Sequence, residues 1–417
     1  MPFSPLIKNL KSTLDGKFIE ESQGIKLKSK FDYDSGTLVM GYDYTTTNVK
    51  RDSLVTTDRF KFSDVSIDNF PIPPNLLGTL EGIVTIKNSF DISKDTHALY
   101  LLNNYNLTEK LALTTGLRYE YSKYNGYRNS FGNIKGYNLE NGGILFPNNN
   151  SNKILINDYT AIDKSTDNFA GEIGLNYKFS EVGSIYTRYE RGFISPLPSQ
   201  LTNKENQKYT NSNLKSETID SIEFGIKDVI DNSFITVSIF FSQTNNEIAT
   251  LDRNANNPAL KEWKFENIGQ TRRYGSEIFA QHYFDKLTLS ESITYIDAKI
   301  KKVNSNEWLK EGDKVPIVSK WKITLGADYK FNDKFSLGAT YVYNSSYEKR
   351  ELESYNKYKI SGFGVTDLYG KYNIKDYLTV KIGVNNIFNE HYNYFETATT
   401  AIPAPERNYY LGLSLKF

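Results

Sequence analysis

Apolar and polar side chains alternate at every second position along most of the chain from residue 25 onward. In the segment 321–331, Trp, Ile, Leu, Ala, Tyr and Phe occupy one face, and Lys, Thr, Gly and Asp occupy the other. Three polar residues follow at 332–334, and the alternation then resumes from Phe335 to Asn344. Successive side chains of a β-strand point to opposite faces, so this pattern predicts a hairpin with one apolar and one polar face.

The same unit recurs along the chain, with connections that alternate strictly in length. Short turns are expected at 34–36, 108–110, 180–181, 231–232, 285–286, 332–334 and 375–376. Long loops rich in Asn, Lys and Pro are expected at 49–93, 125–166, 194–216, 249–263, 301–317, 348–360 and 389–406. The pattern gives about fifteen strands long enough to cross a bilayer. It predicts an all-β, transmembrane antiparallel β-barrel with short periplasmic turns and long extracellular loops, and with aromatic residues at both membrane interfaces.

Composition permits a membrane barrel although the chain looks soluble on average. Of 417 residues, 39% are hydrophobic and 14% aromatic, and the mean hydropathy is -0.52. Barrel strands carry their lipid face in every second residue, so a low average is expected of them. Lys and Arg number 50 against 49 Asp and Glu, a balance that gives no reason to expect a nucleic-acid partner. Cysteine is absent, which excludes disulfides and thiolate chemistry.

The main structural alternative is a secreted all-β repeat protein whose alternation would bury one face in a soluble core, as in a β-sandwich. A sandwich core favours Val, Ile and Leu from two sheets, whereas these apolar faces end in Tyr, Phe or Trp. Glu291 does not fit the pattern, because it shares a face with Leu289 and Ile293. Either a β-bulge shifts the register there, or this carboxylate faces lipid at a cost of about a few kcal/mol.

The end of the chain forms one more alternating segment. Its apolar face contains Tyr409, Leu411, Leu413, Leu415 and Phe417, and the chain stops on that phenylalanine. In a closed barrel the last strand pairs with the first, so that no edge remains. The pattern also resembles the aromatic-ended signal that the outer-membrane assembly machinery reads.

Four short segments, in order and at expected strand boundaries, resemble those of TonB-dependent outer-membrane receptors. Arg191–Pro196 (RGFISP) followed by Asn213–Thr218 (NLKSET) resembles "R-G-F-x-x-P … N-x-L-K-P-E". Phe265–Glu277 resembles "N-x-G-x-x-x-x-x-G-x-E", and Gly383–Tyr392 resembles "G-V-x-N-L-F-D-x-x-Y". Pro405–Leu413 resembles "P-G-R-x-Y-x-x-G-L". The resemblance covers nearly the whole chain.

Family barrels have twenty-two strands, a plug domain that fills the lumen, a signal peptide and a short box for the energising TonB complex. The sequence shows about fifteen to sixteen strands and none of the other parts. We therefore expect residues 1–24 to be a partial extracellular loop or the remnant of an earlier part of the barrel. Residues 25–417 are expected to form an incomplete receptor-like barrel, from a truncated or split receptor. The TonB complex would then act only through a plug that is not in this chain.

Catalytic motifs are not evident. The three histidines, His97, His282 and His391, lie in unrelated segments, without a HExxH or a Gly-x-Ser-x-Gly motif. We predict no enzyme activity, no cofactor and no metal site. The enzyme alternative is an outer-membrane phospholipase or protease, because such barrels host Ser/His or Asp/His sites, but the sequence indicates no residue for either.

The resemblance implies uptake of an iron chelate at the bacterial outer membrane, with outer-membrane lipid around the barrel. The loop 197–212 has no histidine, which disfavours haem, so a ferric siderophore is expected. Such an anionic, aromatic ligand would be bound by Arg, Lys and Tyr side chains at the extracellular vestibule. The candidates are Tyr124, Tyr127, Arg128, Arg188, Arg191, Arg272, Arg273, Lys349 and Arg350. Each has a simpler interpretation as a solvated loop residue or a paired lumen charge.

Two other functions fit the same fold. A barrel without a plug is able to act as a passive porin-like channel, with polar residues along its lumen. The expected lumen residues are Thr114, Arg118, Glu120, Glu172, Asn176, Lys322 and Asp328. An adhesin barrel would need a passenger domain, for which the sequence gives no sign.

Overall fold

The computed structural model describes residues 11–61, 80–139, 152–205, 208–253, 262–304, 309–350, 357–396 and 401–416. Across these ranges the regular structure is β, apart from the 3-10 helix η3 (Pro198–Gln200). Fifteen strands form one antiparallel sheet in which each pairs with the next sheet strand along the chain. The sheet strands are β1 (Lys11–Tyr33), β2 (Gly36–Lys61), β3 (Leu80–Asn106), β4 (Leu111–Leu139), β5 (Asn152–Lys178), β6 (Ser184–Ile194), β9 (Glu217–Ile230), β10 (Ser233–Asn245), β13 (Gly269–Phe284), β14 (Leu287–Val303), β15 (Trp321–Lys330), β16 (Phe335–Asn344), β19 (Phe363–Lys375), β20 (Leu378–Asn385) and β23 (Asn408–Leu415).

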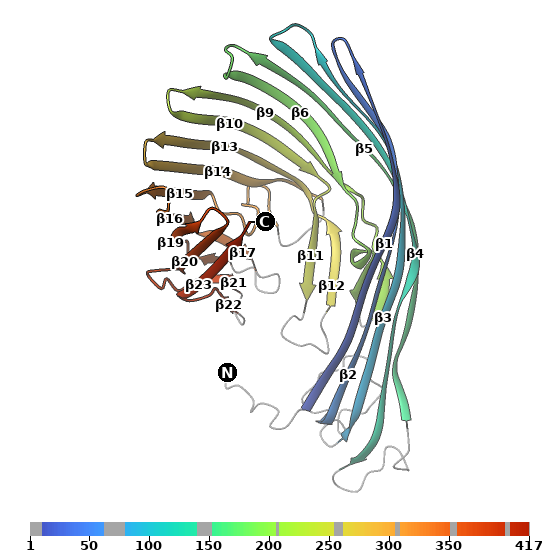
Figure 1. Ribbon diagram of the computed structural model, residues 1–417. Helices are drawn as coiled ribbons and strands as arrows, with labels where there is room; N and C mark the ends of the chain where they lie inside the picture. Colours follow the sequence, from blue (N-terminus) through green and yellow to red (C-terminus); the bar gives the residue numbers. More distant parts are fainter. Residues whose placement is uncertain are drawn as a thin grey trace.

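The fold class and the strand count predicted from alternation are confirmed. Every short turn expected from the sequence separates two strands paired in the sheet, beginning with β1–β2 at 34–35 and ending with β19–β20 at 376–377. The sheet curves strongly, as Figure 1 shows. It stays open in this chain: β1 pairs with β2 alone and β23 with β20 alone among the described strands. The first-to-last pairing that would close a barrel is thus not present among the described strands.

The long loops are less irregular than the sequence suggested. Strands β2 to β5 continue far beyond the length needed to cross a bilayer, which is about 9–11 residues, and reach 26, 27, 29 and 27 residues. Much of the expected loops 49–93 and 125–166 is thus extended hairpin. The first strand also begins at Lys11, so residues 11–24, which belong to the segment expected as a partial extracellular loop or a remnant of an earlier part of the barrel, continue β1.

Chain segments from two loops form a second, smaller sheet on the concave side of the large one (Figure 1). Its strands are β7 (Thr202–Glu205), β8 (Lys208–Asn211), β11 (Ile248–Arg253) and β12 (Glu262–Asn267), in the order β11-β12-β7-β8. We call it the internal sheet. Two further hairpins are formed by β17 (Tyr347–Arg350) with β18 (Lys357–Ile360) and by β21 (Asn393–Glu396) with β22 (Ala401–Pro403).

The two faces of the large sheet differ as the alternation predicts. On one face, called the lipid face here, Leu117 and Phe169 are 70% and 66% exposed. On the opposite, lumen face, Arg118 lies 3.3 Å from an Asp43 oxygen and 3.0 Å from a Glu120 oxygen. Apolar groups thus point outward and charges are paired inside, the reverse of a soluble protein. In the described ranges no helix is long and apolar enough to span a membrane.

The register around Glu291 decides between the two interpretations left open by the sequence. Glu291 pairs with Ala280 on one side and Leu325 on the other, and the only register shift between β13 and β14 lies at Gln270/Thr271. No bulge therefore turns Glu291 away. Its carboxylate lies on the lipid face, 3.6 Å from the Nε2 atom of His282.

Candidate functional site

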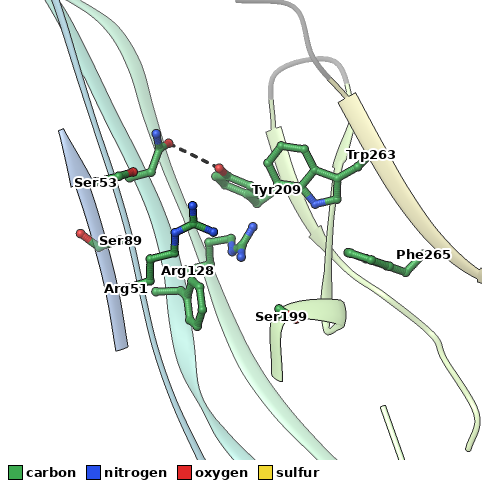
Figure 2. A pocket seen from close by; sticks show the side chains of 10 residues that line it. Arg51, Ser53, Ser89, Arg128, Ser199, Tyr209, Trp263 and Phe265 are labelled. Carbon is green, nitrogen blue, oxygen red and sulfur yellow. Dashed lines mark hydrogen bonds between the residues drawn. The ribbon is translucent and has the colours of Figure 1, made fainter. Parts of the chain in front are cut away.

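A cavity of about 460 Å³ lies between the large sheet and the internal sheet. Figure 2 shows it from close by, with the Arg51 and Arg128 side chains pointing into it. It is lined by Arg51, Ser53, Asn88, Ser89, Phe90, Arg128, Ser199, Tyr209, Trp263 and Phe265. Two cations and four aromatic rings thus surround one space.

The first wall of the cavity is formed by neighbouring strands of the large sheet, and their register determines which side chains line it. Arg51 on β2 is opposite Phe90 on β3, which is opposite Arg128 on β4, so the three side chains form one row across the lumen face. Arg128 is the eighteenth residue of β4. About 9–11 residues of a strand suffice to cross the bilayer, so this row lies outside the membrane, on the extracellular extension of the sheet.

The internal sheet supplies the facing wall. Tyr209 on β8 and Trp263 on β12 have ring centroids 5.8 Å apart. Strand β12 reaches β7 through the pair Trp263 and Lys204, and the Phe265 N–H donates to the Asn203 side-chain oxygen at 2.9 Å. These contacts between two separate loops place three aromatic rings opposite the arginine row.

The loop that carries η3 is fixed to the wall by polar contacts. The Tyr124 hydroxyl donates to the Pro196 carbonyl at 2.8 Å, and the Asn168 side-chain amide donates to Ser195 Oγ at 3.1 Å. Burial raises the pKa of Tyr124 to about 12, so this hydroxyl keeps its proton. Leu201 then packs into a buried cluster on the lumen face, formed with Val49, Phe90, Ile92, Tyr124 and Ile162.

The electrostatics of the cavity favour an anion. The Arg128 guanidinium carbon lies 5.0 Å from the ring centroid of Phe90, 5.1 Å from that of Tyr209 and 5.7 Å from that of Trp263. Burial lowers the pKa of Arg128, the nearby Arg51 lowers it further, and Tyr209 opposes both; no carboxylate is among the described groups that act on it. Its buried Nε atom has no hydrogen-bond partner in the described chain. A partly desolvated cation without a counter-ion is unfavourable, so a bound anion would be stabilising here.

The structure separates the candidate ligand residues proposed from sequence. Arg128 lines the cavity, and Tyr124 supports the loop beside it. Tyr127 lies on the opposite face, where its ring stacks on Tyr159 at 5.7 Å. Alternation along β4 explains this, because neighbouring residues cannot share a face.

The other arginines lie away from the cavity and already have partners. Arg188 is 3.2 Å from Glu190 and 3.8 Å from Glu223, and Arg191 is 3.2 Å from Asp220. Arg272 donates to the Gln243 side chain at 2.9 Å and Arg273 pairs with Glu247 at 3.1 Å.

The last two candidates and the C-terminal residues complete the comparison with the sequence. Lys349 and Arg350 pair with Tyr358 and Lys357 in the β17–β18 hairpin, and their side chains are outside the described ones. In β23, the apolar face carries Tyr409, Leu411, Leu413 and Leu415, all more than half exposed, whereas Phe417 lies outside the described residues.

Sequence reasoning missed most of the cavity. The alternation pattern predicts a loop at Arg51, and it does not identify Tyr209, Trp263 and Phe265 as ligand residues. The available signal was aromatic residues inside polar loops, for example Trp263 between Glu262 and Lys264. The described residues contain no group of three His, Cys, Asp or Glu side chains arranged to hold a metal ion.

An antiparallel sheet with an outward apolar face, a polar lumen face and a cavity on its extracellular extension defines a membrane-barrel receptor wall. The chain belongs to the TonB dependent receptor-like, beta-barrel family, whose family model matches residues 9–387.

Individual relatives are distant. The probable TonB-dependent siderophore receptor PiuA of Acinetobacter baumannii is 23% identical over 322 residues, which are 73% of this chain and 38% of PiuA. The ferric yersiniabactin uptake receptor FyuA of Yersinia pestis has a similar structure, with a TM-score of 0.68 at 13% identity, covering 98% of this chain and 55% of FyuA. The solved structure of PiuA gives a TM-score of 0.61 at 17% identity, covering 95% of this chain and 64% of that chain. This chain therefore spans less than two thirds of each relative.

Proposed function

We propose that this chain is the barrel portion of an outer-membrane receptor for TonB-dependent uptake of an anionic iron chelate, a ferric siderophore. The observation that carries the proposal is Arg128, a partly buried cation among three aromatic rings, with a buried Nε atom and without a described carboxylate partner. An anionic ligand with aromatic groups would neutralise the guanidinium and stack on the rings. Arg51 on the same row would add a second positive charge.

The relatives support the same class of cargo. PiuA is described as a probable siderophore receptor and FyuA as a receptor for ferric yersiniabactin. Family membership also supports a receptor over the passive porin-like channel. In the complete receptor, the barrel provides the wall and the ligand cavity, and the TonB complex would act through a plug domain.

Uptake of radioactive iron tests this proposal in cells that produce the complete receptor containing these residues. A panel of ferric siderophores is supplied under iron limitation, and saturable uptake is measured with and without an uncoupler. We expect Arg128→Ala to lower the affinity for the transported chelate about 10- to 100-fold, because a desolvated charged hydrogen bond contributes about 1.5–3 kcal/mol.

Arg191→Ala is the matched control, since Arg191 pairs with Asp220 away from the cavity. It should leave uptake unchanged. Uptake that does not saturate and is not inhibited by the uncoupler would instead favour a passive channel. Equal uptake by the Arg128→Ala variant and the unchanged receptor would show that the cavity does not bind the transported chelate.

A further inference from the structure

Three polar side chains from three successive sheet strands meet on the lipid face. Ser233 is the first residue of β10, His282 lies near the end of β13, and Glu291 is on β14. Ser233 Oγ is 2.8 Å from His282 Nδ1, and His282 Nε2 is 3.6 Å from Glu291 Oε1. Polar and ionisable groups that face lipid are costly and commonly mark function.

Strand register fixes this cluster. Ser233 is directly opposite His282, and Glu291 lies two residues beyond Leu289, the residue opposite His282 on the other side. All three side chains therefore share one face. Their surroundings are apolar and exposed: Ile230 is 55% exposed, Phe284 53% and Leu325 41%.

The order of contacts is that of a nucleophile, a general base and an acid that orients the base. One imidazole nitrogen reaches the serine hydroxyl, and the other faces the carboxylate. The 3.6 Å separation exceeds a hydrogen bond, as is common for catalytic contacts before substrate binds. We propose that Ser233, His282 and Glu291 form a serine-hydrolase triad that cleaves an acyl ester of a membrane glycerophospholipid.

The position of Ser233 indicates the substrate class. Ser233 directly follows the short turn at 231–232, so it lies at the end of a membrane strand. Phospholipid esters occupy this boundary between hydrocarbon and head groups, and the exposed Ile230 and Phe284 offer an apolar surface to an acyl chain.

The reaction balances with water as the only co-reactant. Ser233 Oγ forms a bond to the ester carbonyl carbon while its proton moves to His282 Nδ1. The carbon–oxygen bond to glycerol breaks, and the imidazolium returns that proton to the leaving alkoxide, which releases a lysophospholipid. Water then gives a proton to His282 and attacks the acyl-serine, and Ser233 leaves with this proton as a fatty acid is released. Glu291 stabilises the imidazolium in both steps.

A lipid-like fluorophosphonate tests the proposal, because it phosphonylates an activated serine. The full chain is labelled in isolated outer membranes, the labelled residue is identified by mass spectrometry, and release of fatty acid from labelled phosphatidylethanolamine is measured. We expect label on Ser233. We expect fatty-acid release to fall at least about 100-fold in His282→Ala, the usual contribution of a general base. In Glu291→Gln it should fall about tenfold or more, because the imidazolium loses its charged partner.

Ser290→Ala is the matched control: Ser290 adjoins Glu291 on β14 but points to the other face, toward Gly326. It should keep full labelling and activity, whereas Ser233→Ala should lose both. If Ser233→Ala does not reach the membrane, Ser233→Cys, which is similar in size, must lose the fluorophosphonate label. Absence of label from the inserted wild-type chain, or label that persists in Ser233→Ala, overturns the proposal. This activity is independent of the receptor function proposed above, since neither the cavity nor iron takes part.

Discussion

Arg128 is a partly buried cation, and strand register places it in one row with Arg51 and Phe90. Residues that are opposite each other on neighbouring strands point to the same face. Register alone therefore places the Phe90 ring beside Arg128 and Arg51 beside that ring. The planar guanidinium is able to stack on rings and bind two oxygen atoms at once, which an ammonium group cannot do.

Replacing Arg128 with lysine separates charge from shape. Arg128→Lys retains the positive charge but loses stacking over Tyr209 and Trp263. We expect about a tenfold loss of affinity for the transported chelate, because a cation–π contact contributes about 0.5–2 kcal/mol. Equilibrium binding to the purified complete receptor measures it. Arg272→Lys is the control, since Arg272 stacks on Phe241 and donates to Gln243 outside the cavity; full affinity in Arg128→Lys would show that charge alone matters.

The Tyr124 hydroxyl gives a second prediction at this scale. Tyr124→Phe removes the hydrogen bond to the Pro196 carbonyl and leaves the ring in its buried cluster. The loss of about 1 kcal/mol should speed amide exchange about fivefold at Leu201 and Ser212, whose N–H groups bond within the η3 loop. Hydrogen exchange with mass spectrometry measures the change. Tyr127→Phe, on the other face, should leave these amides unchanged, and equal protection in Tyr124→Phe would exclude the hydroxyl as an anchor.

Elements that follow from local sequence were predictable, and those built from distant segments were not. The Asp34–Ser35 turn and the Asp285–Lys286 turn are polar breaks in a period-two pattern, and both connect paired strands. The internal sheet joins β7 to β12 through residues about sixty positions apart, such as Lys204 and Trp263. Alternation within one strand contains no information about such a partner, so Trp263 and Tyr209 could not be placed together.

Strands β7 and β12 are joined by few contacts, so a single side chain tests the connection between them. Asn203→Ala removes the acceptor of the Phe265 N–H. We expect exchange of the Phe265 amide to rise about fivefold or more, since a buried donor without a partner costs about 1–3 kcal/mol. Asn211→Ala is the control, because Asn211 bonds to the Ala161 carbonyl on the wall side of the internal sheet. If Phe265 stays protected in Asn203→Ala, other contacts hold the two strands together.

At the scale of the whole molecule, charged side chains are distributed unequally between the two faces of the sheet. The lumen face pairs its ions, as Arg118 does with Asp43 and Glu120, while the lipid face is apolar over most of its height. Glu291 is an exception on this face, and the sequence identified it as one. Its partners, His282 and Ser233, come from other strands, so only the fold could reveal that it is part of a cluster.

The orientation of the two faces predicts unequal effects of one substitution at two nearby positions. Leu117 is 70% exposed on the lipid face, seven residues into β4, whereas Thr114 faces the lumen and bonds to Asn104. Leu117→Arg should lower the free energy of unfolding by about 2–4 kcal/mol, the cost of arginine facing lipid near the bilayer centre. Thr114→Arg should change it by less than about 1 kcal/mol, because the lumen solvates its charge. Urea titration of the complete receptor in lipid vesicles measures both. A soluble sandwich with Leu117 in its core and Thr114 in water would give the same order of costs, but without any dependence on lipid. A penalty for Leu117→Arg that varies with bilayer thickness therefore indicates hydrocarbon on the Leu117 side of the sheet, and a penalty that does not vary would contradict it.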